Sequence, residues 1–229
     1  MWETAFSIVA GAILAILITI VVEAARRPKL RPRIAPVIDA PYPEDRPAKR
    51  GQVLTVDLVN DSLPLCFRWM SRSPALQCSG TISFHQLDGQ RFFKDAMPMR
   101  FARSLQPIPM EIVLGEVRGF VVDPMRLSVD SRIDVYPGES TPIDIAVKFD
   151  SEDECYGWSN LSYFSDPPWR HPDWKLPKGR YLITVAVSSS GQKCTSSFRL
   201  FNDAGPKDFR LEAASASDKV SKAGVKLGG

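Results

Sequence analysis

An aromatic-rich stretch between residues 149 and 181 is the part of the chain best equipped for recognition. It spans about 30 residues and holds three of the five tryptophans, with two tyrosines and a phenylalanine. Connections longer than about 12 to 15 residues are uncommon in compact domains and tend to carry function, and tryptophan, tyrosine and arginine dominate binding at protein interfaces. The stretch therefore predicts a partner-binding surface. Its candidate residues are Tyr163, Phe164, Trp169, Arg170 and His171.

Trp169 and Arg170 lie in the sequence SDPPWRHPDW, in which three prolines flank them. Proline stiffens the backbone and lowers the cost of ordering a binding loop. No alternating period aims Trp169 at a core, so we expect both side chains to contact a partner. The alternative is that rings of this stretch form a satellite core capping one end of the domain, an interpretation that we favour for Trp158 and Trp174.

Residues that commonly hold metals or attack substrates are sparse and scattered. A structural zinc site needs four clustered ligands, whereas this chain has no C-x-x-C pair and two isolated histidines, His85 and His171. Alternation along its strand predicts that His85 lies on the surface. There is no G-x-S-x-G elbow and no glycine-rich phosphate loop. We therefore expect a non-enzymatic protein with no catalytic residue, no cofactor and no metal site.

The four cysteines and one acidic run have simple structural interpretations. The run at 150–154 lacks the spacing of a calcium loop and is typical of a solvated loop. In a reducing compartment the cysteines stay unpaired and behave as small hydrophobes when buried, whereas in an oxidising compartment they could pair. The cysteines are Cys66, Cys78, Cys155 and Cys194, of which Cys78 and Cys194 fall on inward-facing strand positions.

The net charge of +3 is concentrated near the N-terminus. Residues 24–50 hold eight Lys/Arg and three Asp/Glu, giving +5, and residues 1–23 carry −2, so residues 51–229 carry 3 − 5 + 2 = 0. A domain that binds nucleic acid through its phosphates needs a cationic face. A neutral domain without such a face argues against nucleic acid as a partner.

A run of 17 uncharged residues, from Phe6 to Val22, predicts a membrane-spanning helix. With its alanine neighbours the run approaches the roughly 20 residues that cross the hydrocarbon core. A cleaved signal peptide is the main alternative, but the chain begins without the usual positive charge and two arginines would directly follow the cut. We therefore favour an anchor that is retained, with the lipid bilayer as one partner.

The charges flanking this helix predict its direction. All the nearby Lys and Arg residues lie on its C-terminal side, and cytoplasmic flanks carry the Lys/Arg excess. The N-terminus should then face out, with Trp2 in the outer interfacial belt, and the large domain should face the cytoplasm. The same cations could contact anionic lipid headgroups, although a topology signal alone explains them. They are Arg26, Arg27, Lys29, Arg31 and Arg33.

The rest of the chain divides by composition. Six of the 19 prolines fall between Pro28 and Pro47, which predicts an extended, semi-rigid juxtamembrane spacer with room for a short edge strand over 34–38. Beyond residue 202 the apolar period fades, so the end of the chain is expected to be disordered. The predicted organisation is an anchor at 1–25, a basic proline-rich linker at 26–51, a β domain at 52–202 and a tail at 203–229.

From residue 52 the apolar pattern has period two, as in a half-buried strand. Leu54, Val56 and Leu58 fall on one face, and Asp88-Gly89 predicts a hairpin turn. No helical period follows the anchor. Several short strands separated by turns favour a sandwich over a parallel α/β sheet. The other predicted strands are 76–87, 90–93, 117–122, 127–136, 143–149, 181–187 and 194–201.

The segment LPKGRYLITVAV, from Leu176 to Val187, has a Pro-x-Gly turn followed by an alternating Tyr-x-Ile-x-Val-x-Val face. It resembles the penultimate strand of bacterial immunoglobulin-like and fibronectin-type sandwiches. The resemblance implies an immunoglobulin-like antiparallel β-sandwich behind a single transmembrane helix. Such folds serve unrelated functions, so the resemblance implies no activity.

These observations favour a membrane-tethered, non-catalytic interaction module, such as an accessory subunit of a membrane complex, that binds a protein near the cytoplasmic face. The alternative is an outward-facing envelope domain that binds sugar or peptide through the aromatic stretch and has paired cysteines. A hydrolase that uses Asp150, Glu152 or His171 has little support. The orientation of the domain distinguishes the first two hypotheses.

Overall fold

The computed structural model shows a mainly β protein with one N-terminal apolar helix, as the sequence predicts. It describes residues 2–40, 51–67, 69–104, 110–115, 117–121, 132–150, 152–165, 167, 169–190, 192–203 and 208–215.

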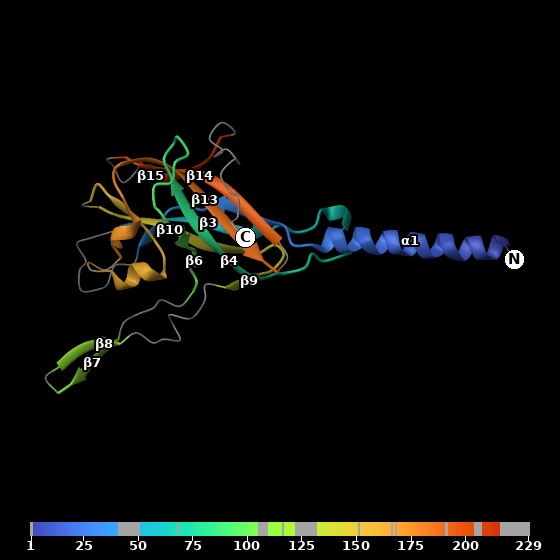
Figure 1. The fold of residues 1–229 in the computed structure, drawn as a ribbon, viewed down its shortest axis with the longest axis horizontal. Helices are drawn as coiled ribbons and strands as arrows, with labels where there is room; N and C mark the ends of the chain where they lie inside the picture. Colours follow the sequence, from blue (N-terminus) through green and yellow to red (C-terminus); the bar gives the residue numbers. More distant parts are fainter. Residues whose placement is uncertain are drawn as a thin grey trace.

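Helix α1, from Trp2 to Arg26, projects from one end of the domain (Figure 1). Within its span Phe6–Arg26, an 18-residue window has a mean hydropathy of 2.6, and none of that window is buried inside the protein. A helix that exposes large apolar side chains on all sides is not a core helix of a soluble domain. By length and composition, α1 can cross a membrane.

The first sheet is antiparallel and follows the order β1-β3-β10-β11-β12, with β2 beside β3 and β6 beside β10. Its strands are β1 (Leu30–Ile34), β2 (Ile38–Ala40), β3 (Gly51–Asn60), β6 (Arg100–Phe101), β10 (Ser140–Phe149), β11 (Cys155–Gly157) and β12 (Lys175–Leu176).

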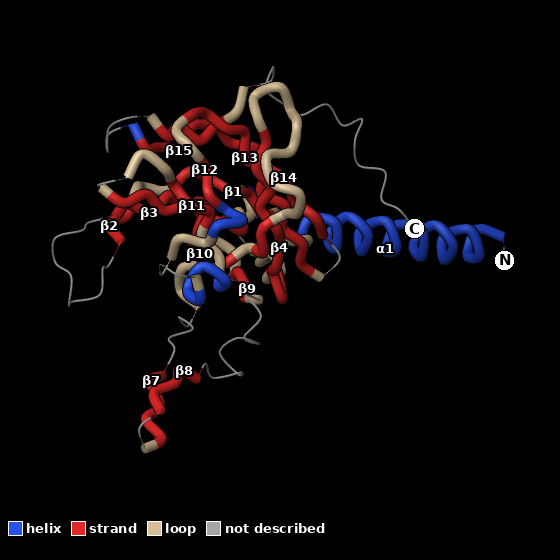
Figure 2. Tube along the Cα trace, turned by 60° about the vertical axis from the view of Figure 1, so that its left-hand side comes forward, coloured by secondary structure: helices blue, strands red, loops and turns tan. Residues whose placement is uncertain are grey.

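The second sheet is also antiparallel and follows the order β15-β14-β13-β4-β5, with β9 beside β4. A separate hairpin, made by β7 and β8, lies apart from both large sheets (Figure 2). These strands are β4 (Ala75–His85), β5 (Met97–Pro98), β7 (Met110–Leu114), β8 (Val117–Val121), β9 (Ile133–Val135), β13 (Gly179–Ser189), β14 (Gln192–Asn202) and β15 (Phe209–Ala213). Within the described residues, the named 3₁₀ helices between the strands are η1 (Leu65–Phe67), η2 (Asn160–Phe164) and η3 (Pro172–Trp174).

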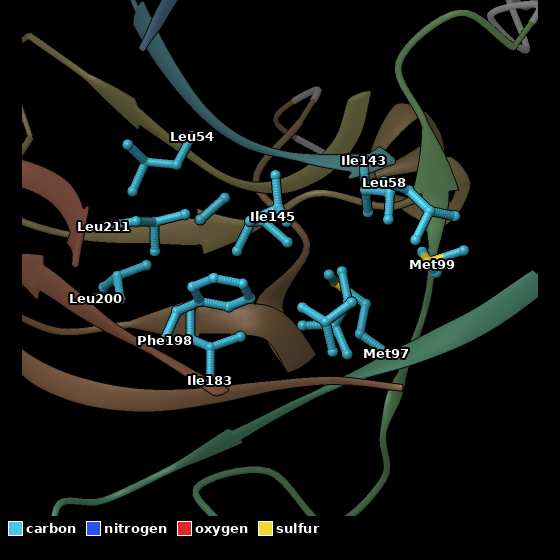
Figure 3. Close-up of a cluster of buried hydrophobic side chains, with 14 of the residues drawn as sticks. Leu54, Leu58, Met97, Met99, Ile143, Ile145, Ile183, Phe198, Leu200 and Leu211 are labelled. Carbon is cyan, nitrogen blue, oxygen red and sulfur yellow. The ribbon is translucent and has the colours of Figure 1, made fainter. Parts of the chain in front are cut away.

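Side chains from both large sheets meet in one core (Figure 3). The predicted inward face of β3 is confirmed, because Leu54, Val56 and Leu58 are all buried. From the other sheet, Ile183 and Leu200 pack into the same cluster. Burial of such side chains contributes about 1.5 to 3 kcal/mol each, which makes this interface the main stabilising feature of the fold.

A glycine in β4 permits the close approach of the central strands of the second sheet. A Cβ atom at Gly80 would lie 2.1 Å from the carbonyl oxygen of Ala186 in β13. Real Cβ atoms are not found so close to a backbone oxygen, so no side chain fits at this position without a backbone shift. The predicted turn at Asp88-Gly89 is also present, with Gly89 at a φ of 89°.

The expected juxtamembrane spacer instead contributes two strands to the first sheet. All five residues of β1 pair with β3, from Leu30 opposite Asn60 to Ile34 opposite Val56, and β2 also pairs with β3. Proline is tolerated on an edge strand, so Pro32 does not prevent pairing. The domain therefore begins directly after the helix and does not stand away from it on a spacer.

Two other expectations differ from the structure. The tail contributes β15, which pairs with β14 and buries Phe209 and Leu211, whereas residues 216–229 lie outside the described part. His85 is 8% exposed rather than on the surface, because the turn after β4 folds back and Arg91 bridges to it. Burial lowers the pKa of His85.

The predicted strand at 127–136 is described only from 132 onward, where it contains β9.

Candidate partner-binding site

The aromatic stretch lies over the outer face of the first sheet. A β-bulge near Ile145 places Ile145 and Ala146 in the main core, whereas Val147 and Phe149 belong to a second cluster. Val53 joins them, and it points away from the main core because its neighbour Leu54 points into it. The second cluster consists of Val53, Val147, Phe149, Tyr156, Trp158 and Tyr163, with Trp169 packed against it.

The helix η2 is fixed in place by its own hydroxyl groups. Ser159 caps its N-terminus in a capping box with Ser162, and the Ser162 hydroxyl also donates to the carbonyl oxygen of Gly157 at 3.1 Å. Both serines are fully buried. A capping box satisfies two backbone donors at once, so η2 has a defined position on the sheet.

Trp169, which we expected to contact a partner rather than fill a core, is partly buried and packs against the second cluster. Its indole stacks on Trp158, with ring centroids 5.5 Å apart, and lies nearly parallel to Phe149 at 6.4 Å. Its backbone N–H donates to the carbonyl oxygen of Ser162 at 2.8 Å. Trp169 has a φ of 68°, a left-handed conformation that bulky residues rarely adopt. This turn directs the ring back onto the sheet.

Arg170 is also directed inward, contrary to expectation. Its guanidinium lies 3.8 Å from the centroid of the Phe149 ring and 2.7 Å from a carboxylate oxygen of Glu152. Only 11% of its side chain is exposed. An arginine held by a ring and a carboxylate has little freedom to reach a partner. Glu152, expected in a solvated loop, is thus part of the same site.

A buried ion pair supports the second cluster. Arg100 of β6 contacts Asp144 of β10, and both side chains are almost completely buried. The Arg100 guanidinium also lies 5.3 Å from the centroid of the Tyr163 ring. Burial raises the pKa of Asp144 to about 6, although the charge of Arg100 acts in the opposite direction. The neighbouring guanidinium of Arg100 favours the ionised form of this carboxyl group.

Two apolar side chains of η2 remain on the outside. Leu161 is 45% exposed and Phe164 is 38% exposed. Residues three apart are eclipsed in a 3₁₀ helix, so the two side chains share a face. We call them the Leu161–Phe164 patch. Of the predicted partner-binding residues, Phe164 is exposed, His171 is partly buried beside η3, and Tyr163 is buried.

Comparison of the chain with protein-family models, curated proteins and solved structures finds no match.

The predicted satellite-core role is confirmed for Trp158 but not for Trp174. Trp174 belongs to the main core and Trp158 to the second cluster. The sequence did not single out Leu161, because a leucine beside a serine in a non-periodic segment gives no signal of exposure. Its exposure follows from the serine-capped turn that orients η2.

The described cysteines are buried or half-buried thiols. Cys78, Cys155 and Cys194 are unpaired, and burial raises the pKa of all three, that of Cys78 to about 11. A high pKa keeps sulfur in the thiol form, which is a poor nucleophile. The side chain of Cys66 lies outside the described part. Within the described residues, no three His, Cys, Asp or Glu side chains come together as a metal site would require.

The predicted membrane-interface cations have defined positions. Arg31 and Arg33 both pair with Asp61, at 3.0 and 2.8 Å, so their charge is partly neutralised within the domain. Arg26 ends α1, and the exposed Arg27 and Lys29 follow it. Trp2 at the other end of the helix is 91% exposed.

Proposed function

We propose that this protein is a membrane-anchored, non-catalytic interaction module with an immunoglobulin-like sandwich, in which the Leu161–Phe164 patch binds a protein partner. The observation that carries the proposal is an exposed apolar pair on a helix with a fixed position. Figure 1 shows η2, in orange, at the end of the domain away from α1. The patch would thus be accessible to a partner while the helix remains in the bilayer.

The stacked rings beneath the patch support this role. Trp158, Trp169 and Tyr163 contact one another through their rings, so the backbone that carries Leu161 and Phe164 rests on a packed layer. A site that is ordered before binding loses little conformational entropy when the partner arrives. Trp169 and Arg170 act in this proposal by supporting the patch.

The proposed location is the cytoplasmic face, with the N-terminus outside, and it rests on the Lys/Arg asymmetry around α1. An accessory subunit of a membrane complex fits a domain held close to its anchor. The alternative, an outward-facing envelope domain that binds sugar or peptide through the aromatic stretch, has less support as a sugar-binding domain. Sugar binding uses exposed faces of aromatic rings, whereas here the rings of Trp158 and Trp169 stack on each other.

Site-specific photo-crosslinking tests this proposal. A photoreactive amino acid at Phe164, in the full chain in native membranes, should give one discrete adduct after illumination. The same probe at Leu87, which is 57% exposed in the turn after β4, serves as the matched control and should give no such adduct. Leu161→Asp in the chain that carries the Phe164 probe should remove the adduct, because it places a charge in the apolar contact.

Absence of an adduct from Phe164, or the same adducts from Phe164 and Leu87, would count against the patch as a binding site. Persistence of the adduct in the Leu161→Asp variant would show that the probe reports proximity rather than binding through the patch.

A further inference from the structure

A second group of exposed apolar side chains lies at the opposite end of the domain, in the loop between β3 and β4. Leu65 is 85% exposed, Trp69 is 75% exposed and Phe67 is 39% exposed. Backbone hydrogen bonds from Phe67 to Pro64 and from Met70 to Phe67 give the loop a compact form around η1. Three large apolar side chains on one short loop are unusual for a surface in contact with water.

This loop is attached at both ends to the last residue of α1 and to residues that directly follow it. At its start, the Asp61 N–H donates to the carbonyl oxygen of Lys29 at 3.0 Å. At its end, the Ser73 N–H donates to the carbonyl oxygen of Arg26 at 2.7 Å, and the Arg72 guanidinium donates to that of Arg27 at 2.6 Å. Figure 1 shows the teal coil of η1 beside the end of α1.

The length of the helix sets the depth of the loop. The span Phe6–Arg26 has 21 residues, which correspond to about 31 Å of helix at about 1.5 Å per residue. The hydrocarbon core is about 30 Å thick, so Arg26 falls at the membrane–water interface when the helix crosses. Tryptophan and other amphipathic aromatic side chains are enriched at this level. A loop bonded to the carbonyl oxygen of Arg26 lies at the same level.

We infer that the described loop residues 62–67 and 69–73 form a second membrane contact, which places Leu65, Phe67 and Trp69 in the interfacial layer of the bilayer beside α1. The exposed cations Arg26, Arg27 and Lys29 surround it and suit anionic headgroups. Apolar side chains flanked by cations are the usual composition of segments that lie in the interface. Two attachments, the helix and the loop, then fix the tilt of the domain on the membrane. The inference rests on the proposed membrane anchorage.

Fluorescence quenching in lipid vesicles tests the inference. The full chain with Trp2→Phe has four remaining tryptophans (5 − 1 = 4), of which three lie in the segment 158–174 away from α1. The vesicles contain anionic lipid and phosphatidylcholine brominated near the glycerol end of its chains. In these vesicles, tryptophan fluorescence should fall by the fraction that one of the four tryptophans contributes. The matched variant Trp2→Phe/Trp69→Phe should show almost no loss. Trp69 is 75% exposed, so this change should leave the fold intact, as circular dichroism would verify.

Equal quenching of the two variants would overturn the inference. The exposed loop would then be a candidate for contact with a protein rather than with the membrane. The same vesicles distinguish this result from failure of the anchor. If the protein floats with the vesicles at alkaline pH, the anchorage holds and only the loop contact is in question. If it does not float, the anchorage itself fails, and the loop contact fails with it.

Discussion

Replacing Trp158 with alanine should lower the free energy of unfolding by about 3 to 5 kcal/mol, the usual cost of removing a buried aromatic ring. Trp158 is 5% exposed and contacts the rings of Tyr163 and Trp169, with centroids 6.0 and 5.5 Å away. Domains of this size are stable by about 5 to 15 kcal/mol, so the loss is a large part of the total. Denaturant unfolding of the full chain in mild detergent measures it.

The matched change is Leu161→Ser in the patch. Because Leu161 is 45% exposed, its loss should cost about 1 kcal/mol or less and should weaken partner binding. If Leu161→Ser destabilised the protein as much as Trp158→Ala, the patch would be part of the core rather than a binding surface.

Replacing Arg100 with methionine should destabilise the protein by about 3 to 5 kcal/mol at neutral pH, because it leaves the carboxylate of Asp144 buried without its cation. The cost should shrink as the pH falls. Burial already raises the pKa of Asp144 to about 6, and Arg100 opposes that rise, so its removal raises the pKa further. When the pKa of a carboxyl group is higher in the folded than in the unfolded protein, its protonated form stabilises the fold. This contribution to the free energy of unfolding is complete below the unfolded pKa and is lost as the pH rises from the unfolded to the folded pKa.

Unfolding measured between pH 5 and pH 8 tests the ion pair. The double variant Arg100→Met/Asp144→Asn, which removes both charges, should recover part of the lost stability at the higher pH. A cost for Arg100→Met that does not depend on pH would show that Arg100 acts by packing alone.

Much of the fold is visible in the sequence because it depends on local patterns. The structure confirms two such local patterns: the uncharged run from Phe6 to Val22, which is helical, and the alternation of Leu54, Val56 and Leu58, which are buried. The strands β1 and β15 were missed because each is short. Their pairing with β3 and β14 depends on partners elsewhere in the chain. For β1, the high proline content predicted a spacer rather than a strand.

The candidate site was predictable as a region but not residue by residue. Its aromatic content is the signal that identified the stretch between residues 149 and 181. The direction of Trp169 depends on a left-handed φ of 68° and on a hydrogen bond to Ser162. Neither feature produces a periodic pattern in the sequence. Because the turn directs Trp169 and Arg170 onto the domain and leaves them only partly exposed, the exposed apolar positions fall instead on η2, at Leu161 and Phe164.

The orientation of the anchored domain tests the account most directly. A cysteine introduced at Lys178, which is exposed in the turn before β13, can be labelled with a membrane-impermeant thiol reagent in intact and in permeabilised cells. The unmodified chain is the control, and its buried Cys78 and Cys155 should react slowly. If the domain faces the cytoplasm, the Lys178→Cys variant is labelled only after permeabilisation, with the protein in the membrane fraction. Labelling in intact cells would contradict this orientation and would favour the outward-facing envelope domain.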